Sequence, residues 1–221
     1  MFLKIQNLLS AAENARLTEL SRELRFVDGK VSNPANESKQ NLQADTGDPK
    51  YAESSQLVAN ALARSREFVS FAMPKRVAPP LLARYEPGMK YGPHADSAII
   101  QLSRVALRSD LSCTVFISDP ASYAGGELAL LVGNQTLAFK GAPGEAIVYP
   151  STLLHEVVPV TSGQRLVSIT FIESRIADHH RRLQVYELNE IAALEGNAMH
   201  PESRVRLDVV RQNLMRMWSE T

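Results

Sequence analysis

The chain has 221 residues, of which 44% are hydrophobic, and this is enough apolar material for one sizeable core. Lysine and arginine together number 24, as do aspartate and glutamate, so the formal net charge is zero. A neutral chain lacks the strong positive field of a nonspecific nucleic-acid binder, and its single cysteine, Cys113, excludes an intrachain disulfide.

The first third of the chain is predicted to contain a short strand and two helices. The strand lies within residues 1–8. Ser10 and Glu13 then form a capping-box pattern, and three leucines follow at helical spacing, so we predict a helix over residues 11–24. Apolar residues between positions 54 and 70 predict a second helix.

The segment between these two helices, from Asp28 to Tyr51, is rich in polar residues and glycine and has little periodicity. It is either a long surface loop or a lid over an active site, because loops of this length are uncommon without a role. The sequence supports both interpretations equally, and Asn41 is the residue in the segment to test first.

From Ala72 onward the pattern changes to short β-prone runs broken by Pro and Gly. The predicted strands cover residues 81–85, 112–117, 127–132, 136–139, 146–149 and 165–173. Gly133-Asn134, between two of these strands, is a hairpin signal. Many short strands after a helical start favour an α+β fold with a double-stranded β-helix (jelly-roll) core and flanking N-terminal helices.

The last part of the chain is helical again. Two amphipathic stretches, 177–196 and 201–218, predict a C-terminal helical hairpin. We therefore expect one domain over residues 1–175 and a helical extension over 176–221, which serves packing or joins two copies into a homo-oligomer. The N-terminus lacks the apolar region of a signal peptide, and no apolar run is long enough to span a membrane, so a cytoplasmic location with no membrane partner is expected.

The residues that carry most information about chemistry are His94, Asp96 and His155. Residues i and i+2 of a strand point to the same face, so His94 and Asp96 can reach one metal ion together, and His155 must come from a distant strand. Two histidines and one carboxylate are the ligands of the facial triad, which holds Fe(II) and leaves positions open for substrate and O₂. Zn(II) accepts the same ligands, so these residues alone leave the metal open.

Arg165 follows His155 by ten residues. Its planar guanidinium matches a carboxylate in a bidentate pair that a lysine cannot reproduce. Arg165 is therefore a candidate anchor for a co-substrate that bears a carboxylate.

The segments around these residues form an ordered set. They are Arg84–Pro93, Arg108–Thr114, Asp119-Pro120, Tyr123–Leu128, Gly144–Ser151, Leu154–Val157 and Gly163–Arg165. This set resembles the prolyl-4-hydroxylase-like branch of the Fe(II)/2-oxoglutarate dioxygenases, and it is most similar to the bacterial PKHD-type hydroxylases. The resemblance extends from about Leu3 to the C-terminal helices.

The resemblance implies a role for each candidate residue. His94, Asp96 and His155 would be the iron ligands and catalytic centre, and Arg165 would pair with the distal carboxylate of 2-oxoglutarate. Tyr85 lies where prolyl hydroxylases place a tyrosine that hydrogen-bonds the same carboxylate. The implied cofactors are Fe(II), 2-oxoglutarate and O₂, with ascorbate as reductant, and the implied reaction hydroxylates a substrate with release of succinate and CO₂.

Three positions depart from the family pattern. Ser97 stands where an Asn usually follows the aspartate, and Phe171 and Glu173 replace a Trp and a Gln. None is a ligand position, so these departures bear on the prime substrate, which the resemblance implies is a small molecule or a peptide.

Two other functions stay open from sequence. The first is a nucleic-acid or protein demethylase of the same chemistry; neutral charge and 6% aromatic content argue against the nucleic-acid version. The second is a non-catalytic jelly-roll sensor of a metal or ligand, against which the combined triad and Arg165 argue.

Overall fold

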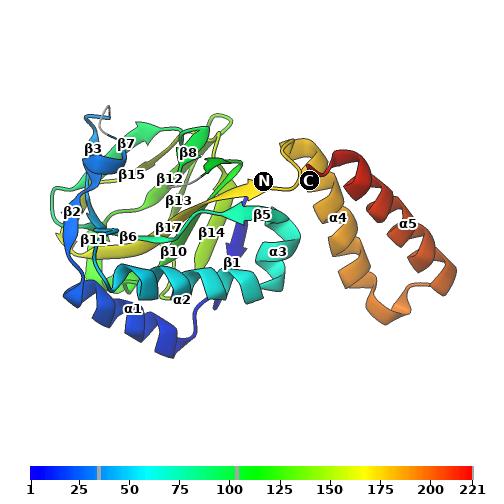
Figure 1. Ribbon diagram of the computed structural model, residues 1–221, viewed down its shortest axis with the longest axis horizontal. Coiled ribbons are helices and arrows are strands. Elements are labelled where there is room, and N and C mark those ends of the chain that lie inside the picture. The colour runs from blue at the N-terminus through cyan, green and yellow to red at the C-terminus, as the bar shows by residue number, and fades with distance from the viewer. Residues whose placement is uncertain (34–35, 103–104, 221) are drawn as a thin grey trace.

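The computed structural model describes residues 1–33, 36–102 and 105–220. Within this part of the chain, two antiparallel sheets face each other, helices cover the outer face of the larger sheet, and a helix pair lies at one end (Figure 1). This arrangement is the predicted α+β class with a jelly-roll core.

The larger sheet contains the central strand of the fold. Among the described residues its order is β1-β14-β10-β17-β6-β4-β2, with β5 paired to β17. The bounds are Leu3–Ile5 (β1), Phe26–Asp28 (β2), Leu42–Ala44 (β4), Pro74–Val77 (β5), Leu81–Tyr85 (β6), Leu111–Phe116 (β10), Ala146–Pro150 (β14) and Arg165–Ser174 (β17). The four strands predicted here between residues 81 and 173 are confirmed to within one residue at each end.

The smaller sheet contributes the two predicted histidine ligands. Its described strands lie in the order β13-β12-β15-β7-β3. Their bounds are Lys39–Gln40 (β3), Lys90–His94 (β7), Leu128–Val132 (β12), Gln135–Phe139 (β13) and His155–Val157 (β15). The predicted hairpin is confirmed, because Val132 pairs with Gln135 across the turn. Two further ribbons pair β8 (Ile99–Gln101) with β9 (Ala106–Arg108) and β11 (Tyr123–Gly125) with β16 (Val160–Gly163).

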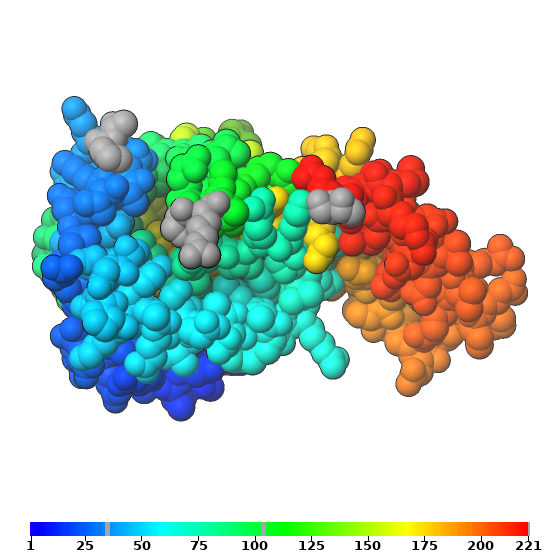
Figure 2. Space-filling view, viewed as in Figure 1, coloured from blue at the N-terminus to red at the C-terminus, as the bar shows by residue number. Residues whose placement is uncertain are grey.

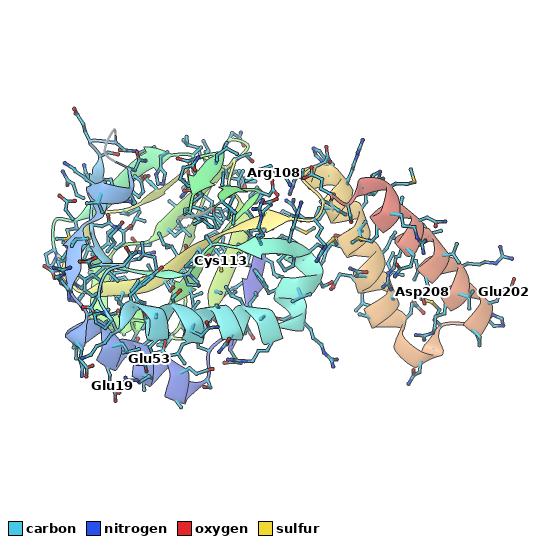
Figure 3. All side chains as sticks on the ribbon, viewed as in Figure 1. Glu19, Glu53, Arg108, Cys113, Glu202 and Asp208 are labelled. Atoms are coloured by element: carbon cyan, nitrogen blue, oxygen red, sulfur yellow. The ribbon has the colours of Figure 1, made fainter. Side chains whose placement is uncertain are left out.

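The central strands β10 and β14 of the larger sheet are buried on both faces, which explains why most of their residues are apolar. On β10, Cys113 and Val115 pack toward the helices, whereas Phe116 packs with residues of the smaller sheet. Cys113, labelled in Figure 3, is 1% exposed, and burial raises the pKa of its thiol to about 12. Cys113 therefore acts as a small buried hydrophobe rather than as a reactive thiol.

The N-terminal helices are held by their caps. Helix α1 (Ala11–Glu23) begins with the predicted capping box, in which Ser10 and Glu13 bond each other's backbone N–H groups. The single helix predicted over 54–70 is wrong, because the chain forms α2 (Tyr51–Arg64) and α3 (Arg66–Ala72). Ser65 has extended backbone angles and its side chain caps α3 by accepting from the Phe68 N–H, so one helix ends where the next begins.

The segment from Asp28 to Tyr51 is ordered by pairing rather than left as a surface loop. A 3₁₀ turn, η1 (Gly29–Ser32), leads to β3, which pairs with β7, and to β4, which pairs with β6. The loop interpretation is therefore wrong for the described residues. Asn41, between β3 and β4, is 5% exposed and belongs to the packed interior.

The C-terminal helical hairpin consists of α4 (His179–Glu195) and α5 (Pro201–Trp218). It is joined to the body by a small apolar cluster around Met73, Ile176 and Val185. Arg108, which lies at this junction in Figure 3, bonds Asp110 of the body and Glu220 after α5. None of the helices described here combines the length and the apolar character needed to cross a bilayer.

Candidate active site

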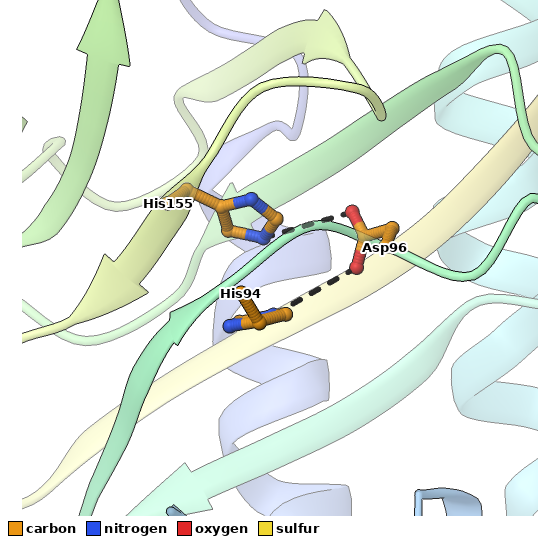
Figure 4. Close-up of side chains that lie close together, drawn as sticks. All are labelled: His94, Asp96 and His155. Atoms are coloured by element: carbon orange, nitrogen blue, oxygen red, sulfur yellow. Dashed lines mark ion pairs between the residues drawn. The ribbon is translucent and has the colours of Figure 1, made fainter. Parts of the chain in front are cut away.

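The structure brings His94, Asp96 and His155 together inside the double sheet. One ligand atom from each lies within 4.8 Å of the others. Asp96 carboxylate oxygens are 3.9 Å from His94 Nε2 and 3.6 Å from His155 Nε2, as the dashed lines in Figure 4 show. Two ligands of one metal, each at about 2.1 Å, are at most about 4.2 Å apart, so an ion can bridge both pairs.

Asp96 does not lie on the same strand as His94, which differs from the prediction. Strand β7 ends at His94, and Asp96 lies in the extended segment that follows. Its backbone N–H donates to Ser151 O at 3.2 Å, which pulls the segment toward the end of β14. The same-face rule for i and i+2 on one strand therefore does not explain the pair. The pairing of β7 with β15, which sets His155 opposite His94, does place the two histidines as expected.

Both imidazoles are oriented by backbone carbonyls. Nδ1 of His94 lies 2.8 Å from Gly92 O, and Nδ1 of His155 lies 2.9 Å from Leu153 O. An Nδ1–H that donates to a carbonyl leaves Nε2 as the free lone pair, and Nε2 is the atom that faces Asp96 in each ring. Burial, together with the nearby His155, lowers the pKa of His94 to about 4, so its ring is neutral at pH 7 and available as a ligand.

The carboxylate of Asp96 is held by a chain of serine hydroxyls. Ser112 donates to Asp96 Oδ2 at 2.5 Å, and its oxygen lies 2.7 Å from the Ser151 hydroxyl. Ser151 in turn lies 2.8 Å from the Ser109 hydroxyl. These three serines were missed from sequence, because only the fold brings β10 and the end of β14 beside the aspartate.

Arg165 is a buried cation without a carboxylate partner in the described structure. It is 1% exposed, and its Nε makes no hydrogen bond. It lines a narrow chamber of about 50 Å³ together with His94, Asp96 and His155. Burying an unpaired guanidinium is costly, so this arrangement fits a ligand that brings its own carboxylate.

Two tyrosines flank Arg165. Tyr85 sits opposite it in the pairing of β6 with β17, and its ring centroid is 5.0 Å from the guanidinium carbon. Burial raises the pKa of Tyr85 to about 12, so its hydroxyl stays protonated and can donate to an anion. The Tyr123 side chain also lies near Arg165, whose positive charge partly offsets the rise of the Tyr123 pKa that burial causes. Tyr123 was not predicted, because no sequence signal separated it from a packed strand tyrosine.

The donor set therefore fits the cofactors that the sequence implied. One imidazole nitrogen from each histidine and one carboxylate oxygen lie within 4.8 Å of one another, and the chamber beside them is also lined by the unpaired guanidinium of Arg165. A divalent metal beside a dicarboxylic acid would satisfy both ends of the chamber.

A second, larger cavity of about 490 Å³ adjoins the chamber on the side of Asp96. Tyr91, Asp96, Ile169, Thr170 and Phe171 line both spaces. A molecule in the larger cavity would therefore lie beside Asp96 without displacing a ligand bound in the inner chamber.

Comparison with known proteins identifies relatives with the same chemistry. Residues 80–173 match the family model of the 2OG-Fe(II) oxygenase superfamily. A PKHD-type hydroxylase of Sphingopyxis alaskensis is 51% identical over 218 residues, which cover 99% of both chains.

Solved structures share the fold at low identity. A prolyl-4-hydroxylase of Pseudomonas putida superposes with a TM-score of 0.52 at 17% identity, over 79% of this chain and 92% of that one. A prolyl hydroxylase of Trichoplax adhaerens, solved with a hypoxia inducible factor peptide fragment, superposes with a TM-score of 0.58 at 14% identity, over 77% and 83% of the two chains.

Proposed function

Because the chain belongs to the PKHD-type hydroxylases of the 2OG-Fe(II) oxygenase superfamily, we propose a role for each residue of its active site. His94, Asp96 and His155 hold Fe(II), and Arg165 and Tyr85 bind the distal carboxylate of 2-oxoglutarate. The protein is a 2-oxoglutarate-dependent dioxygenase with a hydroxylase activity. When bound, Fe(II) with 2-oxoglutarate and O₂ supplies the oxidant for a C–H bond, and succinate and CO₂ leave.

The side chains act by orientation. The carbonyls of Gly92 and Leu153 hold both imidazoles with Nε2 inward, and Ser112 fixes the carboxylate of Asp96. Because these contacts fix the orientation of all three side chains, they favour one position for the metal. The observation that carries the assignment is the convergence of these three ligands beside a buried, unpaired Arg165.

We propose that the prime substrate, a small molecule or a peptide, occupies the 490 Å³ cavity beside Asp96. Its size suits a small ligand or a few residues of a peptide. The Trichoplax adhaerens relative was solved with a peptide fragment, which supports the peptide alternative. Demethylation by the same chemistry would use the same cavity, since it also begins by hydroxylating a C–H bond.

The proposal is tested by succinate release without a prime substrate. The purified protein, with Fe(II), ascorbate, 2-oxoglutarate and air, should release succinate above a metal-free control. His155→Ala and Asp96→Ala should release far less, because each removes one of three ligands. His180→Ala, which changes an exposed histidine of α4, is the matched control and should match wild type.

Wild-type protein that binds Fe(II) and 2-oxoglutarate but never exceeds the control would support the sensor function instead. Normal iron affinity in His155→Ala would show that His155 is not a ligand of the metal.

Three finer points belong to the same proposal. Ascorbate serves as reductant, which its omission from the succinate assay tests. The protein acts in the cytoplasm, a reducing compartment that suits an oxidisable metal and a lone buried thiol, and fractionation of cells tests this. It self-associates through α4 and α5, where Ile191, Leu194 and Val209 are exposed, and sedimentation velocity tests this.

A further inference from the structure

The cavity beside Asp96 is walled by segments far apart in the sequence. The segment from Asp28 to Tyr51 forms one wall, and the residues after His94 and the middle of β17 form the others. Figure 2 looks onto this side, where the light-blue segment and the green residues after His94 flank a hollow. The lining therefore holds residues that neither the triad nor the chamber of Arg165 uses.

Lys39 is one of these residues, and it is buried. It lies on β3, is 5% exposed, and its ammonium donates to Ser32 Oγ at 2.5 Å. The ammonium also lies 5.2 Å from the centroid of the Tyr91 ring. An ammonium has three N–H donors, and among the described residues no carboxylate lies within 4.0 Å of it.

Its charge has no neutralising partner in the described lining of the cavity. Asp96 is the one acidic side chain there, and the proposed metal takes up its charge. Burial lowers the pKa of Lys39 to about 8, opposed by attraction to Asp96 and Asp28, and an anion bound beside the ammonium would favour its protonated form. A buried, unpaired cation is costly unless a ligand compensates it.

The rest of the lining is suited to an apolar body. Pro79, Leu81, Ile100, Leu102 and Phe171 contribute apolar surface. Gln43, on β4, is 7% exposed and adds an amide to the same space. The cavity thus combines apolar walls with one cation at the β3 side.

We propose that Lys39 determines specificity by binding the carboxylate of an anionic prime substrate whose apolar body fills this cavity. The proposal rests on the proposed function, because it takes the cavity to be the substrate site of a dioxygenase. A carboxylate is favoured over a phosphate, because the one described cation of the lining balances one negative charge and a phosphate ester carries up to two.

The test compares an acid with its neutral isostere. Protein loaded with Fe(II) and 2-oxoglutarate under anaerobic conditions is titrated calorimetrically with 4-phenylbutyrate, with 4-phenylbutyramide and with phenethyl phosphate. Wild type should bind 4-phenylbutyrate at least about tenfold more tightly than the amide, as expected for a charge-assisted hydrogen bond. It should also bind 4-phenylbutyrate more tightly than the phosphate.

The preference for the acid should disappear in Lys39→Met and persist in Lys39→Arg, which keeps the charge. Lys90→Met changes an exposed lysine on the neighbouring strand β7 and should keep the full preference. A purely structural role, in which Lys39 only holds Ser32 and Tyr91, would change stability without changing the ratio of acid to amide affinity.

Equal affinity for acid and amide in wild type, an unchanged ratio in Lys39→Met, or no binding of any probe would overturn the proposal. If phenethyl phosphate binds more tightly than 4-phenylbutyrate, the claim that Lys39 recognises a carboxylate rather than a phosphate is wrong. Succinate release by wild type without a prime substrate is measured in parallel. Its absence would count against the proposed function, whereas its presence with no acid preference would count against Lys39 alone.

Discussion

Arg165 carries its charge inside the protein, where the described side chains around it supply no opposite charge. Its neighbours in the described structure are the ring of Tyr85 and the hydroxyl of Tyr123, neither of which is an anion. The guanidinium is therefore held by aromatic neighbours and has no anionic partner among the described residues.

Replacing Arg165 should weaken 2-oxoglutarate binding strongly. Arg165→Ala leaves the distal carboxylate unpaired in a buried chamber and should cost about 3–5 kcal/mol, or roughly two to three and a half decades in affinity. Arg165→Lys should recover only part of this loss, since the bidentate geometry is missing. Anaerobic calorimetric titration measures both, with Arg22→Ala on the exposed face of α1 as control. Equal affinity in wild type and Arg165→Ala would exclude Arg165 as the anchor.

At the scale of elements, the short strands β3 and β4 matter because they carry Lys39 and Gln43 to the cavity. The turn before them packs closely: Gly29 donates its N–H to Asn41 O at 2.8 Å. A Cβ on Gly29 would lie 2.0 Å from Asn41 Oδ1 and 2.9 Å from Asn41 O. Position 29 thus requires a glycine, because Asn41 lies too close to leave room for a Cβ atom, and the β3–β4 connection depends on this close contact.

Gly29→Ala should destabilise the protein by about 1–3 kcal/mol, because the methyl group overpacks against the Asn41 backbone. Gly47→Ala is the matched control, since the nearest atom to its Cβ is the Asp45 carboxylate at 3.3 Å. Its effect should stay below about 1 kcal/mol. Chemical denaturation measures both variants. Equal stability of Gly29→Ala and wild type would mean that this segment moves freely as a loop.

At the scale of the whole molecule, the helix pair α4–α5 is fastened to the body around Ile176 and along α3, where Asn189 donates to Ser70 Oγ and Tyr186 packs edge-on against Phe71. Ile176 is fully buried with Met73 and Val185, and Arg108 bonds Ser174 O and Glu220 across the same junction. The division into a domain over 1–175 and an extension over 176–221 stays a prediction. These contacts suggest how it can be tested.

Ile176→Ala should cost about 2–5 kcal/mol if the extension unfolds together with the body, since it opens a cavity in the shared cluster. Ile99→Ala, which changes a 51% exposed isoleucine of β8, should alter the free energy of unfolding by no more than about 0.5 kcal/mol. Thermal unfolding followed by circular dichroism compares them. A separate, earlier transition of the helices in Ile176→Ala, with the body unchanged, would show that the two parts are independent.

The sequence by itself determined the features that short-range patterns encode. The capping box of α1, the hairpin at Gly133-Asn134 and the long strand from Arg165 each depend on neighbours within a few residues, and all three are found where predicted. The proposed ligands His94, Asp96 and His155 were also named from spacing and residue type. The expectation that His94 and Asp96 share one strand is wrong, because β7 ends at His94 and Asp96 lies beyond it.

Only the tertiary structure decided what surrounds these residues. Lys39 lies 57 positions before Asp96, on a strand of two residues that is too short to show a period, and it reaches the cavity because β3 pairs with β7. The sequence around Ser112 gave no sign of a special role, and the contact of its hydroxyl with Asp96 is visible only once β10 is placed in the fold. Contacts between residues far apart in the chain leave no local pattern, because the free energy that holds them comes from burial and pairing of whole sheets.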